Sequence, residues 1–170
     1  MAVAGATEDG RTAGERALAA VTRPLAVLGG LLMLATAVMV VVSVVMRWLF
    51  SNSISGDIEL VQIATALAVF SFLPLCQLHR GNIMVDTFTW WLPPRAQAAL
   101  DALWDLVYAG FAAMLAWRLG LGAYDTVRSN TVSMMLGLPI GWAIAACAAM
   151  AALLAVVSVW TAIKLLRAPR

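Results

Sequence analysis

Charged residues are scarce in this sequence of 170 residues. Asp, Glu, Lys and Arg together make up 12% of the chain, against about 25% in ordinary soluble domains, and apolar residues make up 63%. A water-soluble core cannot accommodate that surplus of apolar side chains. The composition therefore predicts an integral membrane protein, and the length allows one membrane domain without a separate catalytic domain.

Residues that carry enzyme chemistry are also few. The single histidine, His79, cannot supply the paired axial ligands of a membrane haem, and the two cysteines, Cys76 and Cys147, lie in apolar runs where a thiol behaves as a small hydrophobic group. No cysteine and histidine cluster has metal-binding spacing, and no glycine-rich loop matches a phosphate-binding motif. We therefore expect no enzyme activity, metal or cofactor. The eleven basic residues are scattered singly, which argues against binding to nucleic acid.

Four apolar runs are long enough to cross a membrane. The run from Leu25 to Met46 has 22 uncharged residues, or about 33 Å of helix, against a hydrocarbon core of about 30 Å. The expected spans cover about residues 25–48, 58–79, 97–118 and 138–163. The predicted fold is thus an all-α integral membrane protein, with a polar tail over residues 1–23 and a four-helix membrane domain over residues 24–167.

Local signals mark helix ends and contacts. Asp57 or Ser55 is a candidate cap of the second helix, and Leu138-Pro139 is typical of the opening of the fourth. Gly29-Gly30, inside the first apolar run, indicates close helix packing. Alanines of the fourth run would also permit close packing, within the bundle or against another subunit: Ala145, Ala146, Ala148, Ala149, Ala151 and Ala152.

The segment between the second and third spans predicts a short interfacial helix. It is too short and too mixed in composition to cross a membrane. Its apolar residues nevertheless fall near one face of a helix: Ile83, Met84, Phe88, Trp91 and Leu92. We expect this segment to lie in the plane of the membrane surface.

Basic residues at the ends of the spans predict the orientation of the chain. The side that holds both termini has eight of them, namely Arg11, Arg16, Arg23, Arg80, Arg95, Lys164, Arg167 and Arg170. The other side has three, namely Arg47, Arg118 and Arg128. This excess of basic residues predicts that both termini are cytoplasmic.

Three acidic residues are the leading candidates for function, because ionisable groups at membrane depth are costly and tend to face a partner or a cavity. They are Glu59, Asp101 and Asp105. The alternative is that all three lie near helix ends, where headgroups hydrate them and the helix dipole favours an acid in the first turn. With Arg118 at the end of the third span, no charge is expected near the membrane centre, which argues against an autonomous carrier.

Several short motifs, taken in order, resemble a known family. They are Arg47 closing the first span, a Ser-rich turn leading into Glu59, the block Arg80 to Asp86, Leu92-Pro93, and Ser133 through Leu138-Pro139. Over roughly residues 47–166 the chain resembles the DctQ-like small membrane subunit of tripartite ATP-independent periplasmic (TRAP) transporters. One departure is Asn82, where the family often has a histidine, so a role for that histidine does not carry over.

The resemblance implies a sodium-coupled importer of organic acids in a bacterial inner membrane. A large membrane subunit would carry substrate and sodium, and a periplasmic binding protein would deliver the substrate. This chain would act as a scaffold, with Trp90 and Trp91 helping to position it, Arg47 facing the binding protein, and Arg80 and Asp86 pairing or binding lipid headgroups. A haem-free membrane anchor for a peripheral or respiratory enzyme is the alternative.

Overall fold

The computed structural model describes residues 13–50, 56–79 and 94–167. In these ranges the chain forms four α-helices: α1 (Ala13–Phe50), α2 (Asp57–Leu78), α3 (Pro94–Arg128) and α4 (Gly141–Arg167). All four are long and apolar enough to cross a membrane. Within a bilayer each backbone N–H and C=O must bond inside the protein, and a helix does this within one segment. The predicted all-α fold with four spans is confirmed.

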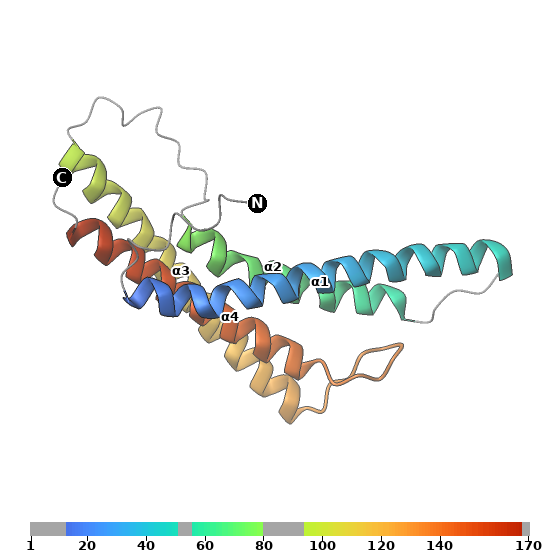
Figure 1. Ribbon diagram of the computed structural model, residues 1–170. Coiled ribbons are helices and arrows are strands. Elements are labelled where there is room, and N and C mark those ends of the chain that lie inside the picture. Colours follow the sequence, from blue (N-terminus) through green and yellow to red (C-terminus); the bar gives the residue numbers. More distant parts are fainter. Residues whose placement is uncertain (1–12, 51–55, 80–93, 168–170) are drawn as a thin grey trace, which may run out of the picture.

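The helices form two antiparallel hairpins that cross (Figure 1). Helix α1 packs along α2, α3 packs along α4, and contacts between α2 and α4 join the two pairs. We call the end where α1 and α3 finish and α2 and α4 begin the Glu59 end, and the opposite end the Lys164 end. At the Lys164 end, Lys164 of α4 forms an ion pair with Glu15 of α1. The described chain therefore begins and finishes at the same end of the bundle.

A narrow seam of small residues joins α1 to α2. Its buried positions in α1 include Ala26, Gly29 and Ser43, and most of the other side chains from Val27 to Phe50 are exposed. A Cβ atom on Gly29 would overlap the hydroxyl of Ser71 in α2, whereas one on Gly30 would meet nothing within 4 Å. The predicted close packing is thus confirmed at Gly29, and Gly30 lies outside the seam.

Helix α4 also presents small residues to its neighbours. Ala143, Cys147 and Ala151 recur every four residues and are buried, so one stripe of α4 packs inside the bundle. Of the six alanines singled out in the sequence, Ala151 belongs to this stripe. Ala145, Ala149 and Ala152 are exposed on the outer side. The alanines of α4 therefore divide between an inner and an outer face.

Two helix ends differ from expectation. Helix α3 continues to Arg128, whereas the expected third span ended at residue 118. Helix α4 begins at Gly141, because Leu138 and Pro139 belong to the preceding loop: the Leu138 carbonyl accepts a bond from Ser133 N at 2.9 Å, and Pro139 pairs with Val132 in an isolated bridge. The prediction that Leu138-Pro139 opens the fourth helix is wrong. The expected interfacial helix and Ser55 lie outside the described residues.

Substitution of Gly29 tests the seam between α1 and α2. Gly29→Leu should lower the free energy of unfolding by about 1–3 kcal/mol, because its side chain must displace Ser71 from a filled contact. Thermal unfolding in detergent measures the change. Gly30→Leu is the matched control and should leave the melting temperature nearly unchanged. Equal destabilisation by the two variants would contradict the packing described here.

Candidate functional site

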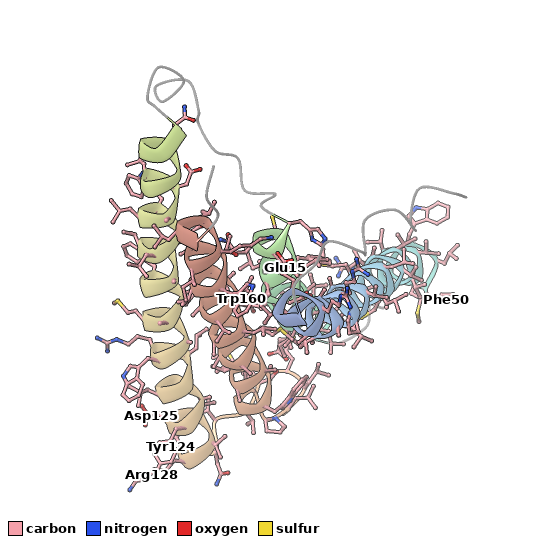
Figure 2. All side chains as sticks on the ribbon, turned by 60° about the vertical axis from the view of Figure 1, so that its left-hand side comes forward. Glu15, Phe50, Tyr124, Asp125, Arg128 and Trp160 are labelled. Carbon is pink, nitrogen blue, oxygen red and sulfur yellow. The ribbon has the colours of Figure 1, made fainter. Side chains whose placement is uncertain are left out.

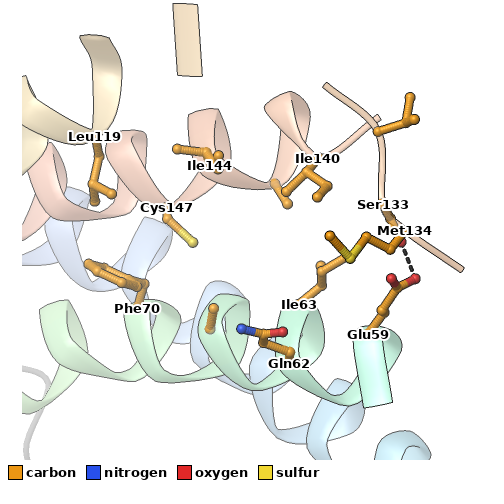
Figure 3. Close-up of a pocket in the computed structure, with 13 residues that line it drawn as sticks. Glu59, Gln62, Ile63, Phe70, Leu119, Ser133, Met134, Ile140, Ile144 and Cys147 are labelled. Carbon is orange, nitrogen blue, oxygen red and sulfur yellow. Dashed lines mark hydrogen bonds between the residues drawn. The ribbon is translucent and has the colours of Figure 1, made fainter. Parts of the chain in front are cut away.

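The carboxylate of Glu59 joins α2 to the loop between α3 and α4 (Figure 3). It accepts hydrogen bonds from the Ser133 hydroxyl, from Met135 N at 2.9 Å and from Leu136 N at 3.2 Å. Hydrogen bonds to an ionised acceptor are stronger than those between neutral groups. Glu59 therefore holds the loop of one hairpin against the first turn of the other.

The loop over residues 129–140 has a backbone shape that presents these donors. Asn130 and Gly137 have positive φ angles of 49° and 64°, values that asparagine and glycine tolerate best. Ser133 N donates to Leu138 O at 2.9 Å, and Gly137 N donates to Ser133 O at 3.1 Å. The tight turn places the N–H groups of residues 135 and 136 toward Glu59.

Gly56 brings the start of α2 close to the same loop. It has φ 80° and precedes the helix as its N-cap, without a capping side-chain hydrogen bond. A Cβ atom at this position would lie 2.5 Å from Leu136 Cγ. Asp57 is the first helical residue rather than the cap, so its prediction as the N-cap is wrong. The fold needs glycine here for both its φ angle and its size.

Arg47 and Asp57 lie beside this contact. The Ser43 hydroxyl donates to Asp57 Oδ2 at 2.7 Å, and an Arg47 guanidinium nitrogen lies 3.8 Å from the same oxygen. The Arg47 side chain is 62% exposed, so water and headgroups screen this ion pair and it contributes little to stability. Arg47 is thus an exposed cation at the Glu59 end that forms a weak ion pair with Asp57.

A cavity of about 470 Å³ opens next to Glu59, between α2 and the α3–α4 hairpin. It is lined mainly by apolar side chains, with Glu59, Gln62 and Ser133 as its polar groups. The other lining residues are Ile63, Ala66, Phe70, Leu119, Val132, Met134, Ile140, Ala143, Ile144 and Cys147. The described residues contain no group of three or more metal-ligating side chains. The cavity is suited to apolar groups rather than to a metal ion.

A second polar contact lies nearer the Lys164 end. Asp105 of α3 is buried and accepts a hydrogen bond from Gln77 Nε2 of α2 at 3.0 Å. Asp101, one turn earlier, is partly exposed. This contact links α2 to α3 inside the bundle, so Asp105 pairs with a neighbouring helix. The sequence analysis gave hydration by headgroups at a helix end as the alternative for Asp105. The buried position of Asp105 does not agree with that alternative.

The structure separates the predicted site residues into distinct groups. Arg47 and Glu59 lie at one end of the bundle, and Asp101 and Asp105 lie in the half of α3 toward the other end. Four predicted residues lie outside the described part of the chain: Arg80, Asp86, Trp90 and Trp91. Sequence reasoning missed Ser43 and Gln77, and it noted Ser133 only as part of a family motif, without its contact with Glu59. Ser43 and Gln77 are uncharged polar residues near the ends of apolar runs. A polar side chain inside a membrane-spanning helix is the signal that could have found them.

These features define a multi-span helical membrane protein whose acidic groups join its own helices and loops. A family model for the tripartite ATP-independent periplasmic transporters, DctQ component, matches residues 36–168. The chain therefore belongs to the DctQ family of TRAP transporter small membrane components, which is a transporter family and not an enzyme family. Searches of curated proteins and of solved structures gave no match.

Neutralising Glu59 tests its contact with the loop. Glu59→Gln should release the loop, because the amide keeps one acceptor oxygen and loses the charge that strengthens three hydrogen bonds. Hydrogen–deuterium exchange at the Met135 and Leu136 amides should become faster by about tenfold or more, since a bond to a charged group contributes about 1.5–3 kcal/mol. Gln62→Ala, on the same cavity wall, is the control. Unchanged exchange in Glu59→Gln would refute the contact.

Proposed function

We propose that the chain is the scaffold subunit of a sodium-coupled TRAP transporter that imports organic acids, such as a C4-dicarboxylate or sialic acid. In this proposal a large membrane subunit carries substrate and sodium, and a periplasmic binding protein delivers the substrate. The observation that carries it is the DctQ family match over residues 36–168, which covers α2 to α4 and the second half of the apolar run of α1. The match favours a transporter over a membrane anchor for an enzyme.

The exposed surface of the helices supports a scaffold role. In the most apolar window of each helix, between 11% and 33% of the residues are buried inside the bundle. The remaining apolar surface is available to lipid and to another membrane subunit. The acidic side chains Glu59 and Asp105 are engaged within the bundle, and this favours bracing of a partner over carriage of an ion.

The proposed complex lies in a bacterial inner membrane with both termini of this chain in the cytoplasm. The eight basic residues assigned to the terminal side support this orientation. The Lys164 end would then face the cytoplasm and the Glu59 end the periplasm. Arg47, at the Glu59 end, would face the compartment of the binding protein.

Co-purification tests the proposed function. The chain, tagged at its C-terminus and expressed from its native operon, should recover a large multi-span permease in stoichiometric amount from mild detergent. Mass spectrometry identifies the recovered proteins. Recovery of a peripheral oxidoreductase instead, or of this chain alone, would sink the proposal.

Charge reversal at Arg47 tests the proposed contact with the binding protein. Arg47→Glu should raise the concentration of binding protein needed for half-maximal uptake by about tenfold, because opposite charges across an interface speed association and a reversed charge slows it. Uptake into proteoliposomes measures the effect. Arg128→Glu is the control, since Arg128 is also exposed at the Glu59 end. Identical kinetics in the native chain and Arg47→Glu would remove Arg47 from the docking surface.

A further inference from the structure

Arg118 lies inside a membrane-spanning helix rather than at its end. Helix α3 continues for ten residues beyond it, or about 15 Å, to Arg128. Between Asp105 and Asp125 the helix has no other charged residue. Figure 2 shows Tyr124, Asp125 and Arg128 together at the end of α3, which marks where the polar end of the helix begins.

The neighbours of Arg118 indicate its depth. The next residue, Leu119, lines the cavity together with Phe70 of α2 and Cys147 of α4. Phe70 lies 13 residues after the start of α2, about 20 Å along a helix of about 33 Å. Helix α4 carries no charge from Gly141 to Ile163, so it crosses the core beside this part of α3. Arg118 therefore lies within the membrane-spanning part of α3, about 10 Å from Asp125 and about 20 Å from Asp105 along the helix.

The side chain of Arg118 is exposed on the outside of the bundle. Its neighbours on this side of α3 are exposed and apolar: Met114 at 60%, Trp117 at 70% and Leu121 at 46%. We call these four residues the Arg118 face. In a helix the Cα–Cβ bond tilts toward the N-terminus, so the Arg118 side chain leaves α3 in the direction away from the nearer, Glu59 end. To reach the headgroups at the Glu59 end, the Arg118 side chain would have to bend back against this direction.

No described residue supplies an anion to Arg118. It takes part in no hydrogen bond or ion pair among the described residues. A parallel second copy would not supply one either: the nearest exposed acid on α3, Asp125, lies seven residues or about 10 Å further along the helix. An unpaired guanidinium within the hydrocarbon core is costly, and such groups pair with an acid or face a cavity.

We propose that the Arg118 face docks a membrane-spanning helix of the large TRAP subunit, and that this helix carries an acidic side chain at the depth of Arg118. The proposal rests on the proposed function and adds the surface and the chemistry by which the two subunits recognise each other. A carboxylate matches a guanidinium in charge and in its two-oxygen geometry. The apolar neighbours Met114, Trp117 and Leu121 would pack on the same partner helix and exclude lipid from the pair.

Co-purification of variants tests the docking surface. Arg118→Leu should reduce recovery of the permease by more than about tenfold, because it leaves the partner's carboxylate unpaired in the membrane. Its own yield and thermal unfolding should match those of the native chain, since Arg118 contacts no partner within the described chain. Arg118→Lys should retain part of the recovery, and Arg128→Leu, the matched control at the end of the same helix, should retain all of it.

Photo-crosslinking distinguishes a protein partner from a lipid. A photo-reactive amino acid in place of Leu121 should give, in native membranes, an adduct with a permease helix within two turns of an acidic residue. Arg118→Glu should then regain recovery when that acid is changed to arginine. Adducts with lipid alone, or full permease recovery by Arg118→Leu, would overturn the proposal while leaving the proposed function intact. A native chain that recovers no permease would sink both.

Discussion

The contact between Glu59 and the loop over residues 129–140 is the constraint on which the arrangement of the two hairpins depends. Within each hairpin the helices pack along their lengths, but the hairpins cross and share a smaller contact between α2 and α4. A crossing by itself leaves the relative orientation of the hairpins weakly specified. Glu59 fixes it at one end, because a single carboxylate accepts from Ser133, Met135 and Leu136 across the gap.

Much of the fold follows from the sequence, because the bilayer permits few structures. The uncharged run from Leu25 to Met46 has to be a helix in lipid, and similar runs account for α2 and α4. The Gly29-Gly30 pair could be identified as a packing signal, but the sequence did not show which of the two glycines faces α2. The sequence did not show which residues far apart in the chain pair with each other. The sequence shows Glu59 and Asp105 as costly groups, but their partners lie on other elements that periodicity does not place together.

The end of α3 shows a second limit of sequence reasoning. An arginine beside a tryptophan is typical of a membrane surface, and this pattern at Trp117-Arg118 predicted the end of a span. The helix instead continues to Arg128, because Ala123 packs inside the bundle and Val127 closes against Gly141 at the start of α4. Tertiary contact with α4 therefore overrode a local signal. The same signal at Arg47-Trp48 does mark the end of α1, where residues 44–50 are all exposed.

Helices α1, α2 and α4 contact one another in turn. Helix α1 lies along α2, α2 crosses α4, and α4 returns to α1 where Trp160 packs on Gly14 and Lys164 meets Glu15 (Figure 2). Two hairpins that touch only where α2 crosses α4 could rotate about that crossing, whereas a second contact, between α4 and α1, opposes the rotation. The contact of α4 with α1 lies apart from the crossing of α4 with α2, so the two contacts together oppose rotation of one hairpin against the other.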